Sequence, residues 1–288
     1  MATFKLFLFG TPRLERDAAA VKLPQRKALA LLAYLAATGK MHARDTLATL
    51  LWPDHSQSGA RMALSRRLYD LNKCLPPGAL TLDAESVALS GDFWLDVTAF
   101  ETTLAAHPTV ATHNLALLQA AVELYTADFL AGFTLHDCPD FDDWQAFQTE
   151  SLRQSLRTAL AKIAWAQAAT GNAEQAITTA RRQLALDPLD ESAHRTLMQL
   201  YAQAGQQAAA LRQYEQCRQI LADELGAPPA AETTELVERI RRGEVRRGVE
   251  EGRSRGEGGK GGRGASPDCG TISSARGSSR KSRPKGTR

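Results

Sequence analysis

The sequence predicts a mainly α protein with an α+β region at its N-terminus and a basic C-terminal tail that does not fold. Three observations support this prediction. Up to about residue 93, short aromatic and apolar runs typical of strands alternate with amphipathic helices. Helices with a 34-residue repeat follow, and residues 241–288 are mainly Gly, Ser, Arg and Lys, with few apolar residues to form a core.

The formal charge is unevenly distributed along the 288 residues. Residues 1–100 hold 12 Lys and Arg against 9 Asp and Glu, residues 101–240 hold 9 against 18, and residues 241–288 hold 14 against 5. The net charge of +3 and the pI near 8.7 therefore reflect the tail. They do not by themselves indicate that the folded part binds nucleic acid.

Four cysteines lie far apart without a CxxC pair, which predicts neither a zinc site nor disulfides and fits a reducing compartment. The N-terminus lacks the apolar run and cleavage site of a signal peptide, and no apolar run is long enough to span a bilayer. We therefore expect a cytoplasmic protein that does not contact a membrane.

The N-terminal elements follow from apolar periodicity and turn residues. They are a strand at 3–9, two short strands within 13–23, a helix at 25–37, a helix at 44–52, a helix at 59–75 and a hairpin at 80–90. Pro24 suits the first turn of the first helix, and Gly39 ends that helix. The second helix stops before Pro53.

The helix at 59–75 is amphipathic at 100° per residue. Its apolar stripe consists of Leu64, Leu68, Leu71 and Leu75. The opposite face carries Met62, Ser65, Arg66, Tyr69 and Lys73, with Arg61 and Arg67 on its flanks. Polar side chains of these types contact phosphates and base edges when a helix lies in the major groove. An ordinary solvated helix has the same pattern, so the helix alone leaves both interpretations open.

The order of strands, three helices and a hairpin predicts a winged helix-turn-helix domain at residues 1–93. In this fold the third helix enters the major groove and the hairpin forms the wing beside it. The wing carries Asp83 and Glu85 but no basic residue, which leaves its contact with the minor groove open. The alternative is a small α+β domain that does not bind nucleic acid.

The 34-residue repeat predicts a tetratricopeptide-like helical domain at residues 94–240. Residues of similar type recur at this spacing: Gly171 with Gly205, Ala176 with Ala210, Ile163 with Leu197, and Leu186 with Ile220. Gly suits the turn between paired helices, and a small Ala suits the place where they touch. Stacked pairs of this kind form a binding surface and not a catalytic one.

An acidic cluster precedes one of these helices. Asp140, Asp142 and Asp143 suit the positive end of a helix dipole. His136 and Cys138 nearby raise the alternative of a metal site, but the spacing of these side chains is irregular. We therefore favour a helix start and expect neither a metal nor a cofactor.

Parts of the chain resemble a known family of regulators. The resemblance is carried by LLWPDHSQSGARMALSRRLYDLNKCL at 50–75, FWLDVTAFE at 93–101, DFLAGF at 128–133 and DELGAPPAAETTELVERI at 223–240. These segments are similar to proteins with a bacterial transcriptional activator domain, the SARP-like regulators, over about residues 3–240. The resemblance implies binding of double-stranded promoter DNA, dimerisation on that DNA and contact with RNA polymerase. It also implies a crossing between two domains at 92–101.

No set of residues in the sequence indicates catalysis. HExxH is absent, and GxSxG and GxGxxG are matched only within the Gly-rich tail, where no strand and helix are predicted to support them. The tail also lacks a phosphate-binding loop, so we expect no enzyme. The tail either adds sequence-independent attraction to DNA, or is a short natural terminus or an artefact of gene calling.

These patterns together predict a DNA-binding transcriptional activator. Arg66, Ser65 and Met62 are expected to face bases, with Tyr69 on the same side of the helix. The expected phosphate contacts are Arg61, Arg67, Lys73, Arg26 and Lys27. The alternative function is a tetratricopeptide-type adaptor that binds only other proteins.

Overall fold

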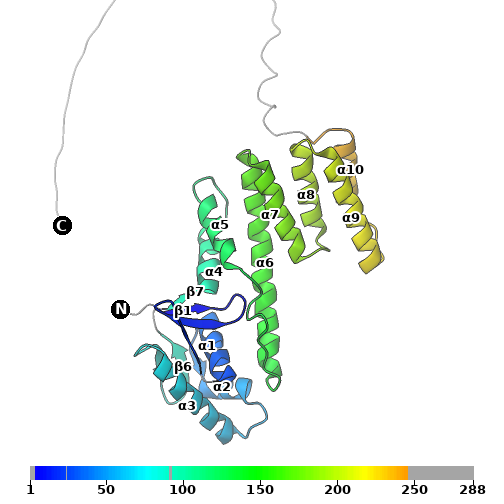
Figure 1. The fold of residues 1–288 in the computed structure, drawn as a ribbon. Coiled ribbons are helices and arrows are strands. Elements are labelled where there is room, and N and C mark those ends of the chain that lie inside the picture. Colours follow the sequence, from blue (N-terminus) through cyan, green and yellow to red (C-terminus); the bar gives the residue numbers. More distant parts are fainter. Residues whose placement is uncertain (1–3, 24, 91–92, 246–288) are drawn as a thin grey trace, which may run out of the picture. The chain divides into compact units, whose positions relative to one another are not determined.

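The computed structural model describes residues 4–23, 25–90 and 93–245. Strands β1 to β7 and helices α1 to α3 make up the N-terminal part, and helices α4 to α10 follow (Figure 1). The prediction of a mainly helical fold with an N-terminal α+β region is confirmed. The predicted disorder of the tail falls, from residue 246 on, outside the described residues, and so does the predicted role of Pro24.

Two small sheets form the β structure of the N-terminal part. The strands are β1 Phe4–Phe7, β2 Arg13–Arg16, β3 Ala19–Val21, β4 His42–Ala43, β5 Leu80–Leu82, β6 Ser86–Leu89 and β7 Phe93–Leu95. One sheet has the order β3-β2-β1-β7, with β7 parallel to β1, and the other has the order β4-β6-β5. The predicted hairpin is confirmed, since β5 pairs with β6 in antiparallel register. Sequence reasoning missed β4 and did not identify β7 as a strand, because such short strands depend on partners far away in the chain.

The three predicted helices of the N-terminal part are confirmed within two residues. They are α1 Arg26–Thr38, α2 Arg44–Leu51 and α3 Gln57–Cys74. Helix α3 begins earlier than predicted because the Ser56 hydroxyl accepts a hydrogen bond from the amide of Gly59 at 3.3 Å. Gly39 ends α1 with a φ of 59°, as expected of a left-handed cap.

A buried carboxylate links the N-terminal part to the first helix that follows it. Asp96 is the first residue of α4 (Asp96–Ala106) and only 2% exposed. Its carboxylate accepts hydrogen bonds from the amides of Leu8 at 2.9 Å, Phe9 at 3.0 Å and Val97 at 2.8 Å. The end of β1 and the start of α4 are thereby held together.

The hydrophobic core continues from the winged helix into the first helices that follow. The ring of Phe9 lies 5.5 Å from that of Phe100 on α4, and the ring of Tyr34 on α1 lies 4.7 Å from that of Trp144 on α6. Phe9 also forms a β-bridge with Phe129. One apolar cluster therefore includes side chains on both sides of residue 93. The division into domains at 93 and 94 remains a prediction.

Consecutive helix pairs make up the rest of the described chain (Figure 1). These helices are α5 Leu115–Leu124, α6 Pro139–Ala169, α7 Ala173–Leu186, α8 Glu191–Gln203, α9 Gln207–Leu225 and α10 Ala231–Arg241. Gly171 and Gly205 occupy equivalent turns with φ of 85° and 75°, and Ala176 and Ala210 are fully buried. The tetratricopeptide-like repeat predicted from the sequence is therefore confirmed.

The acidic segment before α6 starts that helix, as predicted. Pro139 occupies the first turn together with Asp140 and Asp142, and Asp142 accepts a hydrogen bond from the amide of Leu135 at 3.2 Å. The thiol of Cys138 donates to the carbonyl of Leu51 at 3.2 Å. Within the described ranges, no three His, Cys, Asp or Glu side chains lie close enough together to hold a metal ion.

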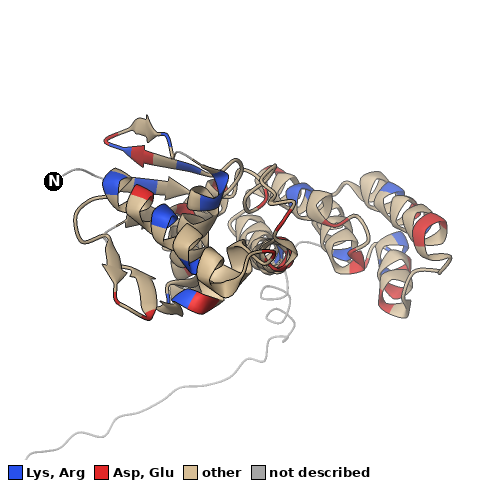
Figure 2. Ribbon diagram, turned by 90° about the horizontal axis from the view of Figure 1, so that it is seen from below, with Lys and Arg blue, Asp and Glu red and all other residues tan. Residues whose placement is uncertain are grey.

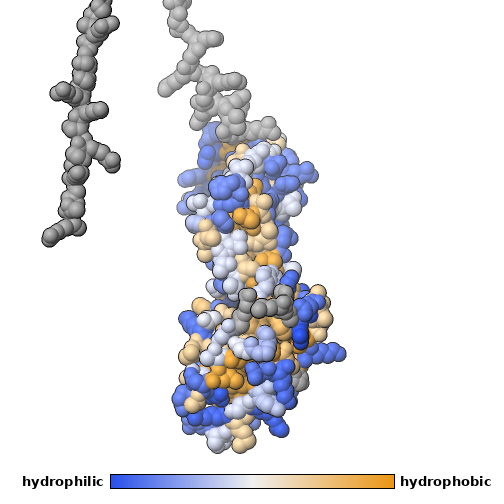
Figure 3. All heavy atoms as spheres, turned by 90° about the vertical axis from the view of Figure 1, so that its left-hand side faces the viewer, coloured by the Kyte–Doolittle hydropathy of each residue, from blue (hydrophilic) through white to orange (hydrophobic). Residues whose placement is uncertain are grey.

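The described helices are too short or too polar to cross a bilayer. On the face shown in Figure 3, areas of hydrophobic residues alternate with hydrophilic ones.

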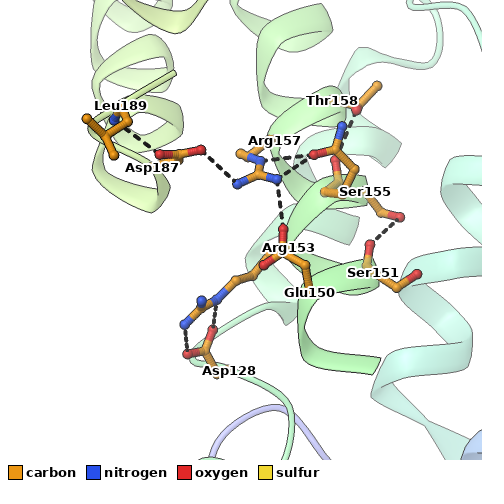
Figure 4. A network of polar contacts seen from close by, with 10 residues as sticks. Asp128, Glu150, Ser151, Arg153, Ser155, Arg157, Thr158, Asp187 and Leu189 are labelled. Atoms are coloured by element: carbon orange, nitrogen blue, oxygen red, sulfur yellow. Dashed lines mark hydrogen bonds and ion pairs between the residues drawn. The ribbon is translucent and has the colours of Figure 1, made fainter. Parts of the chain in front are cut away.

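The ion pair between Asp128 and Arg153 of α6 predicts a pH-dependent contribution to stability (Figure 4). Nε of Arg153 donates to Asp128 at 2.8 Å, and this contact keeps the pKa of the Asp128 carboxyl below its ordinary value. Because the folded pKa is lowered, the pair stabilises the fold above about pH 4, and its contribution is lost as the pH falls through the folded pKa.

Replacing Asp128 with Asn is therefore expected to cost about 1 kcal/mol of unfolding free energy near neutral pH, since both side chains are partly exposed. Thermal unfolding measured from neutral to acidic pH should show this difference shrinking in acid. Asp54→Asn, at an exposed carboxylate, serves as control. If Asp128→Asn lowered the stability by the same amount at every pH, the ion pair with Arg153 would not be the source of the loss.

Candidate nucleic-acid interface

Helix α3 presents the face that carries most of the predicted contact residues. Its leucine stripe is buried against the N-terminal core. This orientation leaves the opposite face of the helix in contact with solvent, because a helix with one apolar stripe can bury only that side. Figure 2, seen from below, shows Lys and Arg at several places on the helices of the N-terminal part.

Five predicted residues are brought together on the outer face of α3. They are Met62, Ser65, Arg66, Tyr69 and Lys73, and all are exposed. Met62 is 74% and Tyr69 61% exposed, so both side chains are accessible to a ligand. Nζ of Lys73 lies 4.2 Å from the centre of the Tyr69 ring, and a hydrogen bond with Tyr69 raises the pKa of Lys73. Lys73 therefore stays protonated at neutral pH.

Arg66 lies in the middle of this outer face. Within the part of the chain that the structure describes, no carboxylate lies within ion-pair distance of its guanidinium. Its donors are therefore available to a ligand. A guanidinium without a carboxylate partner can bind a guanine edge or a phosphate through two parallel hydrogen bonds.

Arg61 is held differently from Arg66. Its Nη2 donates to Asp45 of α2 at 2.6 Å and lies 3.6 Å from a carboxylate oxygen of Glu85 in the wing. The hydrogen bond from Arg61 lowers the pKa of the Asp45 carboxyl. Arg61 thus joins α3 to α2 and to the wing, and a phosphate would have to compete with two carboxylates for it.

Arg44 is a residue of this surface that sequence reasoning missed. Its Nε donates to the carbonyl of Asp83 in the wing turn at 2.9 Å, and its Nη1 donates to Ser65 of α3 at 3.5 Å. Together with Arg61, which lies near Glu85, it joins the wing to α2 and α3. One local signal could have identified it. A basic side chain in the first turn of a helix interacts unfavourably with the positive end of the helix dipole, so its presence there indicates a favourable contact elsewhere.

Three predicted phosphate contacts are placed elsewhere. Nη2 of Arg26 donates to the carbonyl of Thr134 at 2.9 Å, and Nζ of Lys27 contacts Asp137 at 2.6 Å. Arg67 is buried and pairs with Asp70 at 3.0 Å. The structure therefore directs Arg26 and Lys27 toward the segment before α6 and Arg67 inward, and none of them joins the outer face of α3.

Comparisons with known proteins fit this architecture. A model of the bacterial transcriptional activator domain matches residues 95–241. The regulatory protein AfsR of Streptomyces coelicolor is 28% identical over 224 residues, which cover 75% of this chain but only 22% of AfsR. The solved structure of Mycobacterium tuberculosis EmbR in complex with a low-affinity phosphopeptide has a TM-score of 0.69 at 26% identity, and the match covers 84% of this chain and 66% of EmbR.

Proposed function

Because the chain belongs to the family of regulators with a bacterial transcriptional activator domain, we propose that it binds promoter DNA through α3 and activates transcription. The observation that carries this proposal is the outer face of α3, where Arg66 has no carboxylate partner among the described residues and polar or exposed side chains surround it. A helix with such a face can enter the major groove.

Each residue of the outer face has a proposed role. Arg66, Ser65 and Met62 lie in the central part of α3 and read base edges, where Met62 offers an apolar contact to a thymine methyl group. Lys73 and Tyr69, near the end of α3, hold phosphates. Arg61 stays bonded to Asp45 and Glu85 and therefore contributes mainly to the shape of the surface.

The helical part supplies the protein contacts in this proposal. Residues 101–240 carry 18 acidic against 9 basic residues, and such a charge disfavours a position on the phosphate backbone. We assign to it the contact with RNA polymerase or with a second copy of the chain on DNA. Chemistry on a substrate is not part of the proposed function.

The proposal is tested by gel mobility shift with DNA from upstream of the gene and a scrambled duplex of the same composition. Binding to the upstream duplex should be stronger, and the affinity should fall steeply as salt rises, because bound phosphates release counterions. If the full chain binds neither duplex at low salt, the adaptor without DNA binding is the better description. Equal affinity for both duplexes would contradict recognition of a specific sequence.

A further inference from the structure

A concave groove between α7, α8 and α9 has a volume of about 680 Å³. Among the residues that the structure describes, its lining includes two arginines, Arg181 of α7 and Arg212 of α9, and no acidic residue. Both arginines are exposed. This composition is the opposite of that of residues 101–240 as a whole, where acidic residues are twice as numerous as basic ones.

Neither arginine is neutralised within the described ranges. Nε and Nη2 of Arg181 donate to the hydroxyl of Tyr201 at 3.0 Å and 2.6 Å, and no ion pair involves Arg181 or Arg212. The Tyr201 contact orients the guanidinium but does not compensate its charge. An anionic group entering the groove would therefore form charge-assisted hydrogen bonds without displacing a carboxylate.

The acidic residues closest in sequence to the groove are bonded to other groups. Asp187 accepts from Nη1 of Arg157 at 3.2 Å and from the amide of Leu189 at 3.1 Å, as Figure 4 shows. Glu215 pairs with Arg218 at 2.9 Å. These contacts hold the carboxylates of both residues against partners outside the groove lining, so that the groove keeps its positive charge.

The buried side of the groove is fixed by hydrogen bonds. Nε2 of Gln213 donates to Nδ1 of His194 at 2.8 Å, and Nε2 of His194 lies 3.0 Å from the carbonyl of Pro188. The half-buried side chains of Leu184 and Ile220 add apolar surface to the lining. A rigid groove with apolar surface and two separate cationic groups suits an extended segment that alternates acidic and apolar side chains.

We propose that this groove binds an acidic peptide segment of another protein, with carboxylates on Arg181 and Arg212 and an apolar side chain against Leu184 and Ile220. The proposal rests on the function proposed above, in which the helical part contacts proteins. The basic segment 241–288 of this chain has the wrong charge to occupy the groove, since it holds 14 basic against 5 acidic residues.

The test uses fluorescence anisotropy with the full chain and a short fluorescein-labelled peptide in which Glu and Leu alternate. A second peptide carries Gln in place of each Glu. The Glu peptide should bind, the Gln peptide should bind at least about tenfold more weakly, and combined Arg181→Gln and Arg212→Gln should weaken the Glu peptide by about tenfold or more. Arg239→Gln, at an exposed arginine of α10 outside the groove, is the matched control and should bind like the wild type.

Several results would overturn the proposal. These are equal binding of the two peptides, unchanged binding by the doubly substituted protein, or full displacement of the peptide by inorganic phosphate or glutarate at concentrations that indicate a site for small anions. Binding of the same variants to upstream DNA separates this proposal from the previous one. Loss of peptide binding with intact DNA binding supports the groove, whereas intact peptide binding without any DNA binding contradicts the DNA-binding function alone.

Discussion

Reversing the charge of Arg66 is expected to remove specific DNA binding. In Arg66→Glu, the guanidinium in the middle of the outer face of α3 becomes a carboxylate that faces phosphates and base acceptors. The loss of one bidentate contact costs about 1–3 kcal/mol, and repulsion adds to it, so the affinity for upstream DNA should fall by about 100-fold or more. Mobility shift with wild type and variant at several salt concentrations measures the effect.

Arg16→Glu is the matched control for this experiment. It makes the same change in charge at an exposed residue of β2, which is not part of α3. It should weaken binding only slightly, and both variants should unfold at the temperature of the wild type because both sites are exposed. Wild-type affinity of a folded Arg66→Glu protein would show that the outer face of α3 is not the DNA-binding surface.

Removing the carboxylate of Asp96 is expected to destabilise the fold more than any exposed substitution. Asp96→Ala leaves the buried amides of Leu8, Phe9 and Val97 without their acceptor. An unsatisfied buried donor costs about 1–3 kcal/mol, so the loss should reach about 3 kcal/mol or more, a large fraction of the stability of an ordinary domain. Burial raises the pKa of Asp96, whereas the three amides favour its ionised form, which makes these hydrogen bonds essential to keeping a carboxylate there.

Chemical denaturation of wild type, Asp96→Ala and Asp96→Asn measures this effect. Asn retains one oxygen as acceptor but places an amide donor among donors, so its loss should be smaller than that of Ala and still clear. Asp54→Ala, at an exposed carboxylate, should change the free energy of unfolding by less than about 0.5 kcal/mol. Equal stability of Asp96→Ala and Asp54→Ala would mean that the link between β1 and α4 is not structurally important.

Local patterns in the sequence were sufficient for most of the architecture. The leucine spacing of α3, the left-handed Gly39 and the alternation at 80–90 each depend on neighbours a few residues away, and each led to the correct element. The 34-residue repeat identified the paired helices for the same reason, because its Gly and Ala positions are required by the local contact within each pair.

The tertiary structure decided which charged side chains remain available. Arg66 and Arg67 are adjacent in the sequence of one basic helix. Consecutive side chains point 100° apart around the helix axis, so Arg66 lies in solvent and Arg67 lies in the interior beside Asp70. The ion pairs of Arg61 with Asp45 and of Lys27 with Asp137 join segments far apart in the chain. Periodicity describes only one element at a time, and whether a cation is compensated depends on carboxylates that folding alone brings within hydrogen-bonding distance.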